Sequence, residues 1–215
     1  MDKKQKIVVT KDGLESPIFY KEFWSPKVLD NLNKKIDSWY KGEATKIQYN
    51  IWPDVLVQDS GPILIFPLQT GFTPRLDCEE LIADIKNELN VIYDTSALEF
   101  FDCGIHIFLS GSYIPWHDDQ LYEIATHTYL NQERWDWNWG GALLYENKDG
   151  QVGAEFPEYN KLVVVSGNFD GTENYMYHGT TIVAASAPPR FTLQIFAGRD
   201  TPQKEYAKSK RTKYN

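Results

Sequence analysis

Two segments in the first half of the chain carry apolar residues at helical spacing. In the first, Ser25 precedes Pro26, which is typical of an N-cap followed by proline at the first helical position. The apolar positions behind this pair are Val28, Leu29, Leu32, Ile36 and Trp39, and Gly42 closes the segment. In the second, Asp77 and Glu80 predict a capping box. Its apolar face would be Leu81, Ile82, Ile85, Leu89 and Ile92.

Behind the second helical segment the pattern changes to short apolar runs that are separated by Gly, Asn, Asp and Pro, as is typical of strands. These runs are 98–108, 126–130, 142–145, 162–165, 180–183 and 191–196, and 6–10 and 47–52 also look extended. Two helices followed by many short strands predict a mainly β (α+β) protein with helices packed outside a barrel or sandwich.

Apart from 47–52, residues 43–76 fit neither pattern, because prolines and glycines interrupt them repeatedly. Long irregular segments in compact domains often serve as binding loops or lids. A lid and a plain connection both stay open for this segment.

Composition narrows the class of protein. The chain has 215 residues, a formal net charge of -8 and a 42% share of hydrophobic residues, which suits one globular domain without affinity for nucleic acid. No apolar run reaches membrane-spanning length, and the N-terminus lacks a signal-peptide core, so we expect a cytoplasmic protein with no membrane partner. Cys78 and Cys103 form no CxxC motif and are expected to be buried or inert thiols.

A candidate metal site lies near the middle of the chain. In an extended backbone His117 and Asp119 point the same way, and His178, which opens a strand-like run, can supply a third ligand. Two histidines and one carboxylate on one face of an ion are typical of non-haem Fe(II). Zn²⁺ stays open as an alternative, although it more often closes a tetrahedron with nitrogen and sulfur ligands.

A candidate anion site lies further on. On a strand, Arg190 and Thr192 share a face. An inward guanidinium requires an anion, and a planar carboxylate would satisfy it in a bidentate manner. The alternative is a surface arginine beside a turn.

These elements together resemble the 2-oxoglutarate/Fe(II)-dependent oxygenases, specifically the prolyl-4-hydroxylase-like group. The resemblance covers about residues 108–197 and depends on 108–111, His117, Asp119, 129–131, 139–143, 157–164, His178 and 190–192. It implies a double-stranded β-helix (jelly roll, cupin-like) with N-terminal helices packed against the barrel. A single oxygenase domain would fill 1–215, with helical support and a candidate lid in 1–97, the catalytic core in 98–198 and a tail in 199–215.

The resemblance also implies roles for individual residues. His117, Asp119 and His178 would bind Fe(II), and Arg190 would pair with the distal carboxylate of the co-substrate 2-oxoglutarate, supported by Thr192 and by the hydroxyl of Tyr129. The enzyme would use O₂ to hydroxylate an aliphatic C–H and release succinate and CO₂. Two departures, Phe108 where the family often has Tyr and Ala142 where an acidic residue is common, put any transfer of substrate specificity in doubt.

The substrate is less constrained than the cofactors. Candidate substrate contacts are Trp116, Trp137, Trp139 and His127, with ordinary barrel packing as the alternative. The acidic net charge disfavours a nucleic-acid substrate and is compatible with a basic or zwitterionic amino acid or with a peptide. We therefore expect a small-molecule amino acid or a peptide or protein substrate, including a prolyl one. Asp119 favours hydroxylation over halogenation, since related halogenases have a small residue there. A non-catalytic jelly-roll binder of sugars or small molecules and a Zn-dependent hydrolase are the competing readings; oligomeric state is not predicted.

Overall fold

Two antiparallel sheets and two helices make up the computed structural model, which describes residues 14, 16–43, 48–50, 63–70, 73–117, 119, 122–165 and 176–198. In these residues the larger sheet has the order β1 (Ile18–Tyr20), β10 (Leu162–Val165), β7 (Ile124–Tyr129), β12 (Arg190–Gly198), β5 (Phe100–Phe108), β3 (Ile63–Thr70), β2 (Gln48–Asn50), and β4 (Thr73–Pro74) pairs with β3. The smaller sheet has the order β6 (Ile114–His117), β11 (His178–Thr180), β8 (Leu143–Glu146), β9 (Val152–Glu155).

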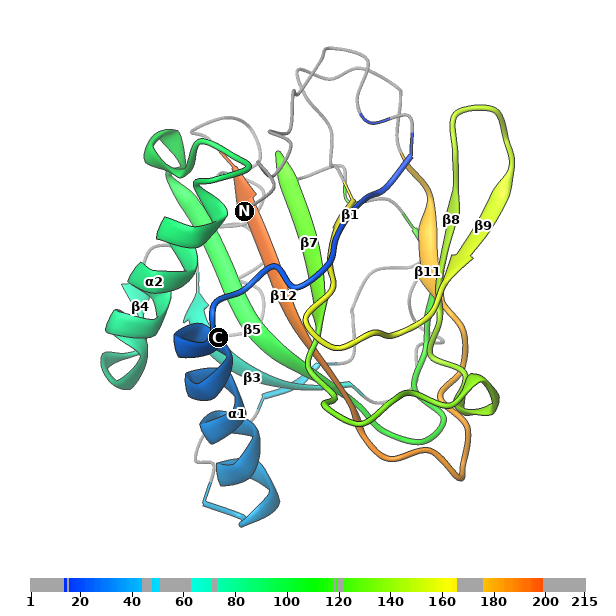
Figure 1. Cartoon of the computed structure of the whole chain (residues 1–215), viewed down its shortest axis with the longest axis horizontal. Coiled ribbons are helices and arrows are strands. Elements are labelled where there is room, and N and C mark those ends of the chain that lie inside the picture. The colour runs from blue at the N-terminus through cyan, green and yellow to red at the C-terminus, as the bar shows by residue number, and fades with distance from the viewer. Residues whose placement is uncertain are drawn as a thin grey trace.

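The helices cover one face of the larger sheet, and the smaller sheet lies beyond the other face (Figure 1). The helices are α1 (Pro26–Tyr40) and α2 (Glu79–Leu89), and short 3-10 turns are η1 (Leu76–Cys78), η2 (Thr95–Ala97) and η3 (Trp137–Trp139). This arrangement is the double-stranded β-helix, so the predicted jelly roll with outer helices is confirmed.

The first helix forms where its sequence pattern predicts. Ser25 caps α1 by accepting a hydrogen bond from the backbone N–H of Val28, and Pro26 occupies the first helical position. The backbone N–H of Ser25 also donates to Glu88 Oε2 at 2.8 Å, which ties the start of α1 to the end of α2. The buried side of both helices packs on the outer face of the larger sheet, against residues such as Leu193 and Ile195.

The segment before α1 is fastened to the sheet by polar contacts. The indole N–H of Trp24 donates to Thr128 Oγ1 at 2.9 Å, and the backbone N–H of Trp24 donates to Asn160 Oδ1 at 2.9 Å. Because Thr128 lies on β7 and Asn160 precedes β10, these bonds fix the helical layer to the strands that carry the site.

Two local predictions were wrong, and three short strands were not predicted. Residues 63–70, predicted to be irregular, form the strand β3 despite Pro67, because β3 pairs with β5 on one side and with the short β2 on the other. The pair of Asp77 and Glu80 makes no capping box, since Asp77 lies in η1 and α2 begins at Glu79 without a side-chain cap. The small strands β1, β4 and β9 had no prediction.

Other predictions fall partly or wholly outside the described residues: the strand at 6–10, much of the candidate lid and the tail at 199–215. Cys78 and Cys103 are buried free thiols, as expected. Among the described residues, no helix has both the length and the apolar content that crossing a membrane would require.

Candidate functional site

The smaller sheet brings the three predicted metal ligands together. His117 ends β6 and His178 begins β11, and these two residues are direct cross-strand partners with ring centroids 4.3 Å apart. Asp119 follows β6 and turns its carboxylate toward both rings, with Oδ2 3.3 Å from Nε2 of His178 and Oδ1 3.8 Å from Nε2 of His117. One ligand atom from each residue lies within 4.8 Å of the other two.

Backbone carbonyl groups set the tautomer of both histidines. Nδ1 of His117 lies 2.9 Å from the carbonyl oxygen of Pro115, and Nδ1 of His178 lies 3.1 Å from that of Met176. A carbonyl oxygen only accepts, so each Nδ1 carries the proton and each Nε2 turns a lone pair toward Asp119. Such a hydrogen bond from the ring nitrogen that faces away from the metal orients imidazoles that bind metal ions.

The carboxylate of Asp119 completes the fit to a cation. Its side chain is 2% exposed, and Oδ2 accepts no hydrogen bond because the nearest nitrogen presents a lone pair. The lone pairs of the two imidazoles and of the buried carboxylate repel one another unless a cation lies between them. These three residues therefore fit a divalent metal ion.

The other end of the same cavity carries a buried cation. Arg190 is 2% exposed, and burial lowers its pKa to about 10, which still leaves it charged at neutral pH. Its NH1 group donates to the carbonyl oxygen of Gly141, and its guanidinium carbon lies 3.8 Å from the ring centroid of Phe108. Its Nε–H has no acceptor, and among the described residues no carboxylate lies within ion-pair distance.

Two further polar residues accompany Arg190. Thr192 is the cross-strand partner of Tyr129, and both line the cavity beside Arg190. The hydroxyl of Thr192 is buried without a hydrogen-bond partner. Burial raises the pKa of Tyr129 to about 12, so its phenol stays protonated and can donate. A buried cation with unused donors beside it is the surrounding that a carboxylate requires.

The predicted substrate contacts separate in the structure. His127 lines the cavity, with its ring centroid 5.8 Å from that of His178. The three tryptophans do not belong to the cavity wall. Trp116 is 41% exposed beside His117, and Trp139 packs edge-on against Trp135.

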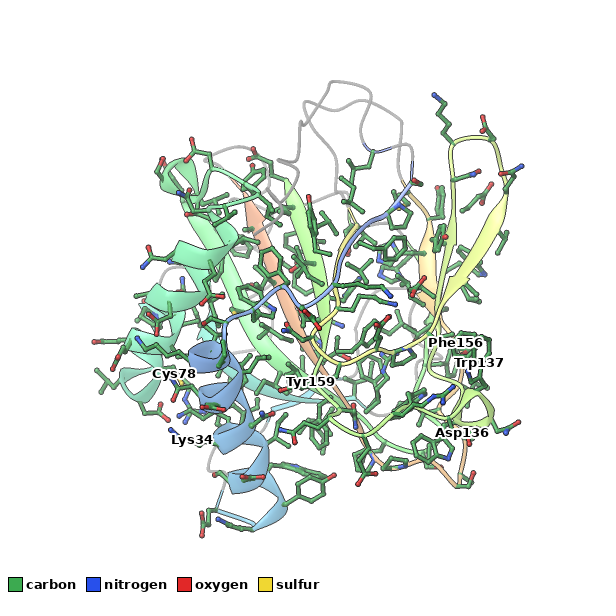
Figure 2. The ribbon with its side chains drawn as sticks, in the orientation of Figure 1. Lys34, Cys78, Asp136, Trp137, Phe156 and Tyr159 are labelled. Carbon is green, nitrogen blue, oxygen red and sulfur yellow. The ribbon has the colours of Figure 1, made fainter. Side chains whose placement is uncertain are left out.

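The remaining tryptophan lies on the outside of the molecule. Trp137 is 68% exposed and packs against Phe156 with ring centroids 4.4 Å apart, as Figure 2 shows at the edge of the molecule. A role in substrate binding therefore stays a prediction for His127 and for the three tryptophans, and of these four residues only His127 lines the cavity.

Sequence reasoning missed part of the cavity wall. Gln194 and Phe196 line the cavity together with Leu143 and Thr180. The signal for the first two was available, because alternation along a strand places 190, 192, 194 and 196 on one face.

Comparison with known proteins places the fold. No protein-family profile and no curated protein matches the sequence. Solved structures do match, at low sequence identity. A prolyl-4-hydroxylase of Pseudomonas putida has a TM-score of 0.61 and 19% identity, with 86% of this chain and 93% of that chain covered.

Two further structures agree. A prolyl hydroxylase of Trichoplax adhaerens, in complex with a peptide fragment of the hypoxia inducible factor oxygen degradation domain, has a TM-score of 0.65 and 12% identity over 89% of this chain and 87% of that chain. A 2OG-Fe(II) oxygenase family oxidoreductase of Burkholderia pseudomallei has a TM-score of 0.60 and 15% identity over 92% and 96%. The chain thus has the fold of the prolyl-4-hydroxylase-like 2OG-Fe(II) oxygenases.

Proposed function

We propose that the protein is a non-haem Fe(II)- and 2-oxoglutarate-dependent dioxygenase that hydroxylates an aliphatic C–H of an amino-acid or peptidyl substrate. One observation carries the proposal: the cavity that holds His117, Asp119 and His178 also holds Arg190, a buried cation without an anion. The reaction consumes one O₂ and one 2-oxoglutarate and yields the alcohol, succinate and CO₂.

The metal would be held by Nε2 of His117, Nε2 of His178 and the carboxylate of Asp119. Iron bound there supplies the activation of O₂ and the oxidation of the C–H bond. The chain contributes the geometry: Nδ1–H donation to Pro115 and Met176 keeps both rings facing the ion, so neither ligand has to reorganise when the metal binds.

Arg190 would anchor the distal carboxylate of 2-oxoglutarate through its guanidinium, with Thr192 and the phenol of Tyr129 as further donors. The contact of Arg190 with the carbonyl of Gly141 and the ring of Phe108 restrains the guanidinium before the ligand arrives. A restrained anchor reduces the entropy that binding costs and directs the oxo-acid end of the ligand toward the metal ligands.

Substrate class is supported by the relatives and by charge. The similar Trichoplax adhaerens protein is a prolyl hydroxylase in complex with a peptide fragment. The net charge of -8 of this chain is compatible with a peptide substrate. Prolyl peptides and free amino acids are therefore the first substrates to assay.

A binding experiment tests the cofactors. Under anaerobic conditions, addition of Fe(II) and then 2-oxoglutarate should produce the weak visible charge-transfer band of a chelated ferrous ion. The band should disappear in Asp119→Ala and in His178→Ala. A wild-type protein without the band, or a double variant that keeps it, would contradict the proposal. Hydrolytic turnover that needs Zn²⁺ and no 2-oxoglutarate would favour the hydrolase instead.

A turnover experiment tests the substrate class. Succinate release is measured against a panel of free amino acids and peptides with and without proline, at equal Fe(II) and 2-oxoglutarate. Release above the substrate-free rate by an amino acid or peptide, with a product heavier by one oxygen atom, supports the proposal. Release that no member of the panel stimulates would argue against this substrate class.

A further inference from the structure

An additional buried histidine lies on the same face of the larger sheet as the proposed carboxylate anchor. His106 is 5% exposed and lies on β5. It is the direct partner of Thr192 on β12, and Thr192 in turn is the direct partner of Tyr129 on β7. The three residues form one row across three neighbouring strands, and directly paired residues point to the same face of a sheet.

That face is the cavity face. Thr192 and Tyr129 both line the cavity, and the ring of His106 lies 6.5 Å, centroid to centroid, from the ring of Phe196, another cavity residue. Residues directly opposite on paired strands have Cβ atoms only about 5 Å apart, so a group bound over Thr192 is within reach of His106.

The histidine is not satisfied by the protein. Nδ1 of His106 is buried and has no hydrogen-bond partner, and the same holds for Oγ1 of Thr192 and Nε of Arg190. Burial, and then the charge of Arg190, lower the pKa of His106 to about 3, so the ring is neutral at physiological pH. A neutral imidazole has one N–H, which it can carry on whichever nitrogen meets an acceptor.

A shared acceptor accounts for all three unused groups. A carboxylate has about four lone-pair sites, which is enough for donors from Arg190, Thr192, Tyr129 and a further residue. Phe108, one row closer to Arg190, offers only a ring face, so the next donor that β5 can supply on this face is His106.

We propose that His106 is a positioning residue for the dicarboxylate co-substrate: its Nδ1–H donates to the distal carboxylate that Arg190 anchors. The inference rests on the proposed function, because it takes 2-oxoglutarate as the ligand. It assigns a ligand to His106, which is not among the candidate site residues that the sequence indicates.

The test compares two ligands that differ only at the distal end. 2-Oxoglutarate and 2-oxopentanoate share the oxo-acid group, but the second has a methyl group in place of the distal carboxylate. Dissociation constants are measured by calorimetry on the full chain loaded with Mn(II), and the Mn(II) content of each variant is determined. The variants are His106→Phe, which removes the donor, and His106→Asn, whose amide restores one.

His106→Phe should weaken 2-oxoglutarate roughly 10-fold or more, as expected for one lost hydrogen bond to a charged group, and should change 2-oxopentanoate binding less than about twofold. His106→Asn should recover most of the affinity. Thr126→Val is the matched control, because Thr126 is also buried with an unpartnered hydroxyl but pairs with Ile195 of the helix-covered face. The control should leave both constants unchanged.

Two results would overturn the inference: an equal loss for both ligands in His106→Phe, or no loss at all. If wild-type protein binds Mn(II) but not 2-oxoglutarate, the proposed function fails first and the inference fails with it. Should His106→Phe not fold, ¹⁵N-histidine spectra of the Zn(II)-loaded wild type decide the question. The Nδ1 resonance of His106 should move with 2-oxoglutarate and not with 2-oxopentanoate, and an unmoved resonance would refute the assignment.

Discussion

The two faces of strand β12 differ in the polarity of their buried residues. Leu193 and Ile195 point toward the helices and are fully buried in an apolar cluster. Arg190, Thr192 and Gln194 point into the cavity and are equally buried, yet they are polar. One face therefore stabilises the fold, whereas the other places unsatisfied groups where a ligand can use them. Buried polar atoms without partners are rare in proteins, which makes the cavity face the place to look for function.

The largest effect should come from the metal ligands. His178→Ala removes one of three ligand atoms, and we expect metal affinity and turnover to fall at least ~100-fold, since loss of a supporting residue alone costs 10- to 100-fold. Metal analysis of the purified variant together with a succinate assay measures both. A variant with wild-type metal content and turnover would remove His178 from the site.

A substitution on the helix-covered face should lower the free energy of unfolding. Leu193→Ala should lower the free energy of unfolding by about 3 kcal/mol, because it removes buried methyl groups and leaves a cavity. Urea unfolding measures this loss. At a temperature where the variant is folded, its dissociation constant for 2-oxoglutarate should equal that of the wild type. A large change in that dissociation constant would show that the helix-covered face also contributes to ligand binding, contrary to our expectation.

A substitution on the cavity face should weaken the binding of 2-oxoglutarate. Arg190→Leu should cost about 2 kcal/mol in 2-oxoglutarate binding, roughly 30-fold, because one partner of a buried charge pair is lost. The free energy of unfolding without ligand should not fall, since an unpaired buried cation is replaced by an apolar side chain. Calorimetry and urea unfolding on the same sample separate the two effects. Strong destabilisation with unchanged binding would reverse the assignment.

The smallest effect is expected at a glycine. Gly141 has a φ of +66°, and a Cβ there would lie 3.2 Å from Cδ of Arg190. Gly141→Ala should therefore cost about 1 kcal/mol of stability and raise the KM for 2-oxoglutarate severalfold through the displaced arginine. Gly150→Ala is the control, because its φ is also positive but its added Cβ would meet only Glu146. Equal KM values for 2-oxoglutarate in the two variants would show that the Cβ added in Gly141→Ala does not displace Arg190.

Local pattern predicted the parts of the fold that depend on local physics. The N-cap and apolar stripe of α1, and the run at 162–165 that forms β10, need no knowledge of their neighbours. The strand β3 escaped prediction because Pro67 is unfavourable in a strand, and only its pairing partners outweigh that preference. The expected capping box failed because the η1 turn precedes α2 and moves the N-cap by one residue, from Asp77 to Cys78.

The candidate site likewise contains residues that the local sequence reveals and residues that only the folded structure reveals. His117 and Asp119 are two residues apart and could be recognised directly, whereas His178 depends on register that only the folded sheet provides. His106 is not among the candidates from sequence, because a sequence cannot show that Nδ1 lacks a partner. The clustering of tryptophans in sequence suggested a lined cleft, but the side chains of Trp137 and Trp139 pack elsewhere.

A crystal structure of the chain with Mn(II) and 2-oxoglutarate, grown without O₂, would show the metal ligands and the carboxylate anchor together. We expect Mn(II) on Nε2 of His117, Nε2 of His178 and the carboxylate of Asp119, with the distal carboxylate of the ligand on Arg190. A metal bound elsewhere, or a ligand that leaves Arg190 without a carboxylate, would contradict this expectation.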